Sequence, residues 1–136
     1  MMYSLYLPYI VLLLSAWLLS VVIKAFLVRK KEGGFHIKKG FRNGGMPSSH
    51  TSTTVALTTY LLLGMFVELF FVSLLFTIIV ISDAVKVRRT VGLQGEALNT
   101  LLDEKVGVVR GHTKKEVVAG AVLGFVVAVV TYLLFL

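Results

Sequence analysis

Cysteine is absent from this chain of 136 residues, and proline occurs only twice. Without cysteine there can be no disulfide, no thiolate nucleophile and no cysteine-bound metal. Acidic residues are also few, since seven Asp and Glu stand against fourteen Lys and Arg, which gives a formal net charge of +7. Because these basic residues flank long apolar runs, they indicate contact with membrane lipids and not with nucleic acid.

Charge is missing altogether from residues 1–23 and 117–136. Two further apolar runs, residues 51–67 and 69–82, are separated by Glu68, and hydrophobic residues make up 57% of the chain. A membrane-spanning helix needs about 20 apolar residues, so the run from 69 reaches this length only by continuing past Asp83 toward Val85. The pattern predicts an all-α integral membrane protein with about four transmembrane helices, in a single membrane domain over residues 1–136.

A weaker pattern lies between the last two runs. Within residues 91–105, apolar side chains recur at Val91, Leu98, Leu101 and Leu102, with polar and acidic residues between them. This spacing predicts a short interfacial amphipathic helix that lies along the membrane surface.

The fourteen Lys and Arg residues lie only in residues 24–42 and 86–115. Basic loops accumulate on the cytoplasmic side of a membrane, and four helices with an outside N-terminus place all of these charges there. The sequence therefore predicts an integral cell-membrane protein with both termini outside and its basic loops in the cytoplasm. Residues 1–23 carry their charges after the apolar core, so we expect a retained helix and not a signal peptide.

The first candidate site is the segment from Gly44 to Thr53, which leads into an apolar run. Pro47 is expected at the first helical position, with Ser48 and Ser49 beside it. The free N–H groups and the dipole at such a helix start bind anions. His50 would then lie next to a bound phosphate; the alternative is an ordinary helix start with an incidental histidine.

The second candidate site lies before the last apolar run, where Thr113 is a candidate N-cap. One helical stripe at four-residue steps contains His112, Glu116, Gly120, Gly124 and Ala128. The Glu116 carboxylate can hold the N–H of His112 and leave the other ring nitrogen free. The small residues would let another helix pack closely. A simple ion pair at a helix end is the alternative.

A third cluster follows the run that ends at Ser82. Asp83, in or beside a membrane helix, is a candidate for a structural or a site carboxylate. Arg88 and Arg89 suit bidentate contact with phosphate, whereas Lys86 fits better as a topology anchor.

Two of these segments resemble signature motifs of the type-2 phosphatidic acid phosphatase superfamily, which includes lipid phosphatases, bacterial acid phosphatases and vanadium haloperoxidases. The segments are Pro-Ser-Ser-His at residues 47–50 and the stretch from His112 to Gly120, and residues 82–99 look like the divergent branch of that superfamily. The resemblance covers roughly residues 35–136. It implies that His112 is a nucleophile that forms a phosphohistidine, that His50 is the general acid, and that Glu116 orients His112. It implies no metal and no cofactor.

The chain departs from the superfamily pattern in several places. Ser49 replaces a glycine, Glu116 replaces the usual Asp, and Val106 stands where an arginine is usual. The first motif, a Lys seven residues before Arg-Pro, is matched only by Lys39 before Met46-Pro47, so its arginine is missing. The residues expected to bind the substrate phosphate are Ser48, Ser49, Lys39, Arg42, Arg88, Arg89 and Arg110.

These patterns together predict a membrane lipid phosphate phosphatase that hydrolyses a phosphomonoester or pyrophosphate of a lipid. A non-catalytic protein that binds or moves phospholipids or anions is the alternative from another class. A metal site built from His50, Asp83, His112 and Glu116 is a second enzymatic alternative. The superfamily core usually has six helices, so four leave room for a homo-oligomer in which a second copy helps to enclose the site.

Overall fold

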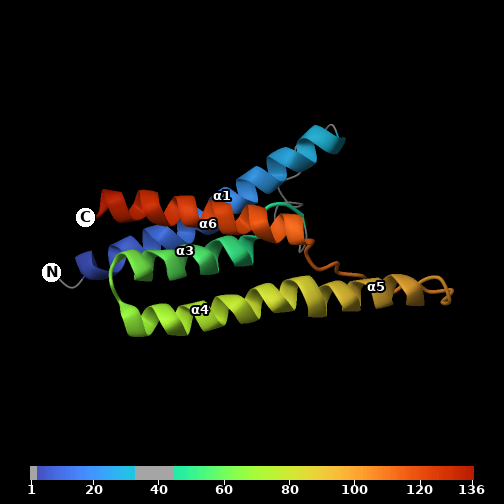
Figure 1. The fold of residues 1–136 in the computed structure, drawn as a ribbon. Coiled ribbons are helices and arrows are strands. Elements are labelled where there is room, and N and C mark those ends of the chain that lie inside the picture. The colour runs from blue at the N-terminus through green and yellow to red at the C-terminus, as the bar shows by residue number, and fades with distance from the viewer. Residues whose placement is uncertain (1–2, 33–44) are drawn as a thin grey trace.

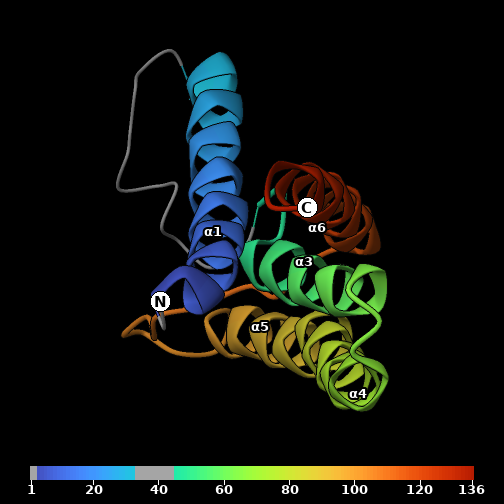
Figure 2. The same ribbon diagram turned by 90° about the vertical axis from the view of Figure 1, so that its left-hand side faces the viewer.

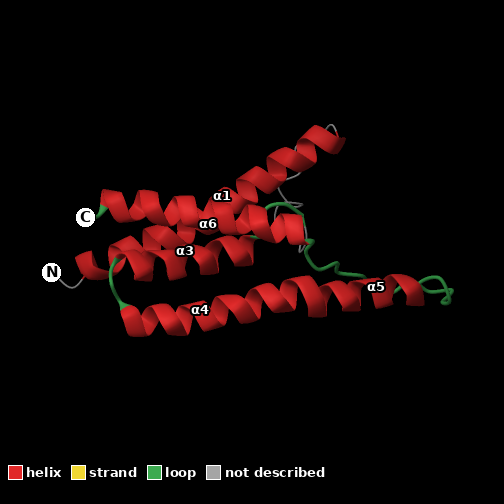
Figure 3. Cartoon of the chain, in the orientation of Figure 1, coloured by secondary structure: helices red, strands yellow, loops and turns green. Residues whose placement is uncertain are grey.

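The computed structural model describes residues 3–32 and 45–136, and these residues form helices without any strand (Figure 3). The elements in chain order are α1 (Tyr3–Glu32), α3 (Ser49–Leu63), α4 (Val67–Ser82), the π-helical turn η1 (Asp83–Val87), α5 (Arg88–Leu98) and α6 (Lys114–Leu134). The start of α1, the turn between α3 and α4 and the end of α6 lie at one end of the bundle (Figure 1). The starts of α3 and α6 lie toward the other end. The predicted all-α membrane fold is confirmed.

Three helical stretches are long and apolar enough to cross a membrane, namely Tyr6–Val28, Val67–Leu98 and Lys114–Leu134. Their outer surfaces are apolar; on α4, for example, Phe71, Val72 and Leu75 are each more than 60% exposed. Soluble monomers rarely expose contiguous apolar surfaces of this extent, so these faces suit contact with lipid. α3 is shorter, with 15 residues.

α3 occupies the centre of the bundle, where it contacts α1, α4 and α6 (Figure 2). It carries many hydroxyl groups, and Thr51, Ser52 and Thr58 are buried. The Thr58 hydroxyl hydrogen-bonds with those of Ser73 at 2.7 Å and Thr77 at 2.9 Å on α4. Because unsatisfied polar groups are costly in hydrocarbon, the polar helix lies inside and the apolar helices surround it.

α3 and α6 approach each other closely at two glycines. A Cβ atom on Gly120 would lie 2.6 Å from the carbonyl oxygen of Ser48, and one on Gly124 would overlap the carbonyl oxygen of Ser52. Ala128, further along the same stripe, is fully buried. The predicted small-residue face is thus confirmed, but α3 of the same chain covers it. This face therefore gives no support for a homo-oligomer.

The end of α3 differs from the prediction. The helix stops at Leu63, and Gly64, Met65 and Phe66 make the turn, with Met65 in the left-handed region at φ 59°. The sequence pattern separates the two apolar runs at Glu68, which would place the turn there, but the turn comes before this residue and that expectation is wrong. Glu68 lies in the first turn of α4, where the free N–H groups and the helix dipole favour a carboxylate.

The third helix continues without a break through η1 into α5, for 32 residues in all, or about 48 Å. The predicted amphipathic helix is present as α5, but it extends α4 and ends at Leu98, so the predicted bounds of residues 91–105 are wrong. The Asn99 side chain ends it by accepting from the N–H of Val106 at 2.8 Å and donating to its carbonyl at 3.0 Å. These two bonds turn the chain back toward the bundle.

The returning segment runs along α5, which has two glycines on that face. A Cβ atom on Gly92 would lie 3.0 Å from Cα of Arg110, and one on Gly95 would lie 3.1 Å from a methyl group of Val108. The absence of side chains at these two positions lets the segment lie against the helix. It thereby brings His112 next to η1.

Candidate active site

α3 begins with Ser48 as its N-cap. The Ser48 hydroxyl is fully buried and accepts hydrogen bonds from the N–H of Thr51 at 3.4 Å and from its hydroxyl at 3.0 Å. Pro47 therefore precedes the cap, and the prediction that it occupies the first helical position is wrong. Because the Ser48 hydroxyl is engaged in the cap, the first-turn N–H groups of Ser49 and His50 are the donors that remain for an anion.

α6 begins with a capping box. The Thr113 hydroxyl accepts from the N–H of Glu116 at 3.3 Å, and Glu116 Oε2 accepts from the N–H of Thr113 at 2.9 Å. The predicted N-cap is confirmed. The same Oε2 atom lies 3.2 Å from Nδ1 of His112, as expected for a carboxylate one helical turn away. A proton on Nδ1 would be donated to Glu116, which leaves Nε2 as the basic ring nitrogen.

His112 is held tightly, with a residue exposure of only 6%. Its backbone N–H donates to the carbonyl of Ala84 in η1 at 3.0 Å. Burial lowers the pKa of His112 below its usual value, although the hydrogen bond and the charge of Glu116 oppose this effect. The ring is therefore neutral near pH 7, which is the form that can act as a nucleophile.

His50 lies on the second residue of α3 and is exposed. Partial burial of the ring lowers the pKa of His50, and the positive charges of Arg88 and Lys24 lower it further. Both histidines line one cavity of about 170 Å³, together with Asp83 and Arg88. Three segments that are far apart in the sequence therefore meet at a single site.

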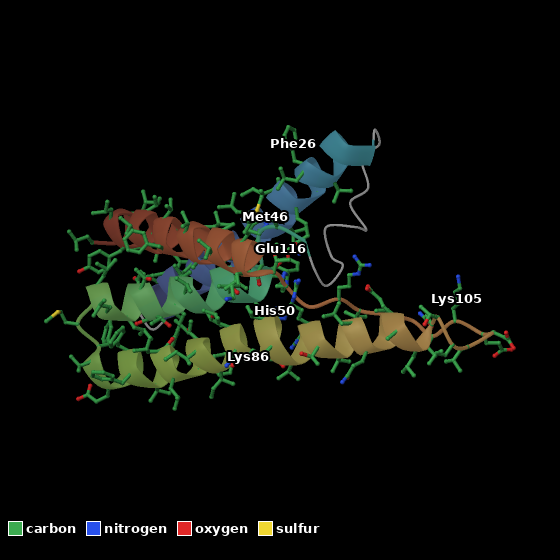
Figure 4. The ribbon with its side chains drawn as sticks, turned by 45° about the vertical axis from the view of Figure 1, so that its right-hand side comes forward. Phe26, Met46, His50, Lys86, Lys105 and Glu116 are labelled. Carbon is green, nitrogen blue, oxygen red and sulfur yellow. The ribbon has the colours of Figure 1, made fainter. Side chains whose placement is uncertain are left out.

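Figure 4 shows this end of the bundle, with Glu116 at the start of α6 and His50 at the start of α3 above the long α4–α5 helix. Lys105 lies far from both, near the turn that follows α5. Lys86 is exposed on η1 and is not among the residues that line the cavity with the histidines. Its position agrees with the role of a topology anchor, which stays a prediction.

The two neighbouring arginines face different cavities. Arg88 Nε donates to Asp83 Oδ2 at 2.5 Å, and Arg88 lines the cavity with the histidines. Arg89 instead lines a second cavity of about 460 Å³, which also contains Arg110 and Glu116. Arg110 forms an ion pair with Glu96. Of the arginines in the described residues that were expected to bind phosphate, only Arg88 lines the cavity with the histidines.

Lys24 is a charged residue close to the candidate site that the sequence interpretation did not include among the site residues. It lies on α1 with an exposure of only 4%, and its ammonium group donates to the Ser49 hydroxyl at 3.5 Å. Its charge also acts on Glu116, His50 and His112. A signal was available, because Lys24 is the only charged residue among residues 1–28 and an ionisable residue within a membrane helix is a functional candidate by default.

Lys39 and Arg42 lie outside the described residues. Within residues 3–32 and 45–136, no group of three or more His, Asp or Glu side chains is arranged to hold a metal ion. The metal site considered from His50, Asp83, His112 and Glu116 is therefore not supported by the positions of these side chains.

The fold and the site define a helical membrane protein with two histidines, a carboxylate and basic side chains gathered at one end of its bundle. The chain belongs to the divergent PAP2 family, whose family model matches residues 7–127. This is the branch of the superfamily that the sequence motifs resemble.

A relative is the uncharacterized membrane protein YuiD of Bacillus subtilis (strain 168), which is 44% identical over 61 residues. That match spans 43% of this chain and only 39% of YuiD. No solved structure matches the chain. The three apolar helices and this relative together support a location in a membrane.

Proposed function

We propose that this protein hydrolyses a phosphomonoester or pyrophosphate of a membrane lipid through a phosphohistidine. The observation that carries the proposal is the cavity shared by His50, His112 and Arg88. The carboxylate of Glu116 lies beside His112, at the ring nitrogen that does not attack. This arrangement supplies a nucleophile, an acid and a phosphate-binding cation within one small volume.

In the proposed first step, Nε2 of His112 attacks the phosphorus atom, and the bond from phosphorus to the leaving oxygen breaks. His50 donates a proton to that oxygen. In the second step, water attacks the phosphohistidine, His50 accepts a proton from it, and inorganic phosphate is released with His112 restored. The phosphate dianion next to His50 favours the protonated ring, which offsets the lowered pKa of this histidine in the free site.

The substrate phosphate would be bound by Arg88 from η1, Lys24 from α1 and the N–H groups at the start of α3. Fixed donors of this kind stabilise the charge on the transferred phosphoryl group, which is the main catalytic effect in phosphoryl transfer. Lys24 would supply a positive charge within the same chain where the first superfamily motif lacks its arginine. A second copy is then not required to complete the charge.

The apolar part of the substrate would approach from the lipid. Ile79 and Val80 of α4 form a wall of the cavity, and Ile79 is 56% exposed on the outer surface. A lipid chain can therefore stay in the bilayer while its phosphate reaches the polar end of the bundle. The distribution of basic residues favours a cytoplasmic site with both termini outside.

The test is phosphate release by the purified protein from lipid monophosphates and lipid pyrophosphates, with and without a chelator. We expect chelator-resistant release by the wild type, none by His112→Ala, and an acid-labile phosphoprotein when a labelled substrate is quenched quickly. A complete lack of release from every substrate would favour the non-catalytic alternative, a protein that binds or moves phospholipids. Val106, in place of the usual arginine, is the observation that favours that alternative.

A further inference from the structure

The π-helical turn η1 lies in the middle of the longest helix, directly beside the site. Such turns are rare and occur frequently at functional sites. The N–H of Arg88 donates to the carbonyl of Asp83, five residues earlier, which is the bond that defines this wider turn. The Ala84 carbonyl in the same turn accepts the backbone N–H of His112 at 3.0 Å.

Gly111 packs against the backbone of this turn. A Cβ atom on Gly111 would lie 2.7 Å from the Ala84 carbonyl oxygen and 2.7 Å from the carbonyl carbon of Arg88, and it would overlap the backbone nitrogen of Arg89. Three main-chain atoms therefore leave no room for any side chain at Gly111. His112, the next residue, is thereby held directly beside the backbone of the helix, with its N–H on the Ala84 carbonyl.

The same turn also determines which arginine faces the histidines. In a regular α-helix, residues five apart point about 140° away from each other. The wider turn brings Asp83 and Arg88 onto one side, where their side chains pair. Arg88 thus lines the cavity with His50 and His112, whereas Arg89 lines the larger one.

We infer that η1 is the positioning element of the site: its Ala84 carbonyl and its contact with Gly111 fix His112, and its register directs Arg88 toward both histidines. Ala84 and Gly111 are then positioning residues that act through His112. The catalytic consequence rests on the proposed function, whereas the positioning of His112 can be measured without any turnover.

The measurement is the rate at which diethyl pyrocarbonate modifies each histidine of the purified full-length protein, followed by mass spectrometry. In the wild type, the exposed His50 should react faster than the buried His112. Gly111→Ala should raise the rate at His112 several-fold and lower kcat more than it changes KM. Gly107→Ala is the matched control in the same segment, because a Cβ atom there would meet nothing within 4 Å. Equal modification of His112 in the two variants would overturn the inference.

Gly92→Ala covers the case in which Gly111→Ala does not fold. A Cβ atom there would press on Cα of Arg110 at 3.0 Å, so the segment must move slightly and His112 should again become more reactive. In the wild type, the amide of His112 should exchange with deuterium more slowly than that of Gly107. Exchange at the same rate would overturn the inference.

The two proposals fail separately. If His112 responds as expected but the wild type releases no phosphate from any lipid, the positioning of His112 stands and the phosphatase proposal falls. If the wild type releases phosphate but Gly111→Ala leaves His112 as unreactive as the control, only the inference on η1 falls.

Discussion

The starts of α3 and α6 both present a histidine within two residues of a hydroxyl N-cap, but they hold it in opposite ways. His50 follows its cap, Ser48, lies within the first turn of the helix and is exposed. His112 precedes its cap, Thr113, and is 6% exposed. Its backbone is bound by Ala84 and its ring by Glu116.

This difference matches the two roles proposed for the histidines. A nucleophile needs one fixed tautomer and one fixed direction of attack, which the contacts of His112 provide. An acid that later acts as a base must exchange protons with the leaving oxygen and with water, and the exposed ring of His50 can do so. Variants at the two histidines and at their neighbours can therefore break or sharpen this comparison.

Removing the two rings should have the largest effects. His112→Ala should abolish turnover on every substrate, because the phosphohistidine cannot form. His50→Ala should lower turnover by about 10²- to 10⁴-fold on alkyl phosphates, the usual contribution of a general acid. Aryl phosphates should be affected much less, since their leaving oxygen needs little protonation. Steady-state rates on both substrate types decide this. If His112→Ala and His50→Ala lose the same activity on aryl phosphates as on alkyl phosphates, the assigned roles are wrong.

Removing a positive charge near the histidines should have the next largest effect on turnover. Arg88→Gln should weaken binding and turnover, because a lost charge-assisted contact costs about 1.5 to 3 kcal/mol, or roughly 10- to 150-fold. Lys86→Gln, two residues away and exposed, is the control and should have little effect. Arg89→Gln should fall between them, because its side chain lines the other cavity. Equal small effects on kcat/KM at all three positions would mean that these side chains serve only as topology anchors.

Changing the carboxylate should have a smaller effect that concerns only the tightly held histidine. Glu116→Gln should keep the fold and lower turnover by roughly 10-fold or more, because an amide stabilises the imidazolium poorly and can select the wrong tautomer. Glu116→Asp should retain more activity. Phosphate release and metal content should be measured for the wild type and both variants. Activity that disappears with chelator and returns with a divalent ion would revive the metal-site alternative.

Acid should destabilise the fold through both histidines. Burial lowers the pKa of His112 below the ordinary value of 6.5, so below that pH the unfolded chain binds more protons than the folded one. Stability should therefore fall as the pH drops through about 6.5 toward the lower folded pKa. His112→Gln should reduce this pH dependence more than His50→Gln, since His112 is more buried. Thermal unfolding in detergent at about pH 7.5 and pH 5.5 measures it, and an equal slope in both variants would contradict it.

The smallest effect on activity is expected from a test of membrane topology. This test measures whether the starts of α3 and α6 both face the cytoplasm. Single cysteines in place of the exposed residues Glu68 and Lys105 should be labelled from opposite sides of the membrane. Glu68 belongs to the first turn of α4, at one end of the bundle, and Lys105 lies near the turn that follows α5, at the other end. Position 105 should react from the cytoplasm. Labelling of both positions from the same side would contradict the proposed topology.

The local features of α6 could be predicted from the sequence alone. Thr113 as cap, Glu116 beside His112 and the small-residue face of Gly120 and Gly124 all depend on residues three or four positions apart on one helix. The geometry of an α-helix makes such residues neighbours whatever the rest of the chain does. The apolar runs likewise predicted the membrane helices, because the length of a run sets whether it can span a bilayer.

Contacts between distant elements could not be predicted in this way. Lys24 reaches Ser49 from another helix, and the capping of α3 uses the hydroxyl of Ser48 that the sequence assigned to phosphate. Periodicity within one helix cannot predict a neighbour on a different one. The predicted ends of α3 and α5 were wrong for a related reason, since the turn at Met65 and the bonds from Asn99 to Val106 end those helices before the hydrophobic pattern does.

Arg88 and Arg89 line different cavities, and this difference shows most clearly what only the tertiary structure decided. The sequence presents them as equivalent neighbours. Nothing in the sequence from Val67 to Leu98 indicates that the helix contains a wider turn. The turn at residues 83–87 lies where the returning segment packs, with Gly111 against its backbone and the N–H of His112 on the Ala84 carbonyl. The sequence thus determined which residues are candidates for the proposed chemistry. Packing between segments that are far apart in the sequence decided which of them share a cavity, because that depends on backbone contacts that no local pattern records.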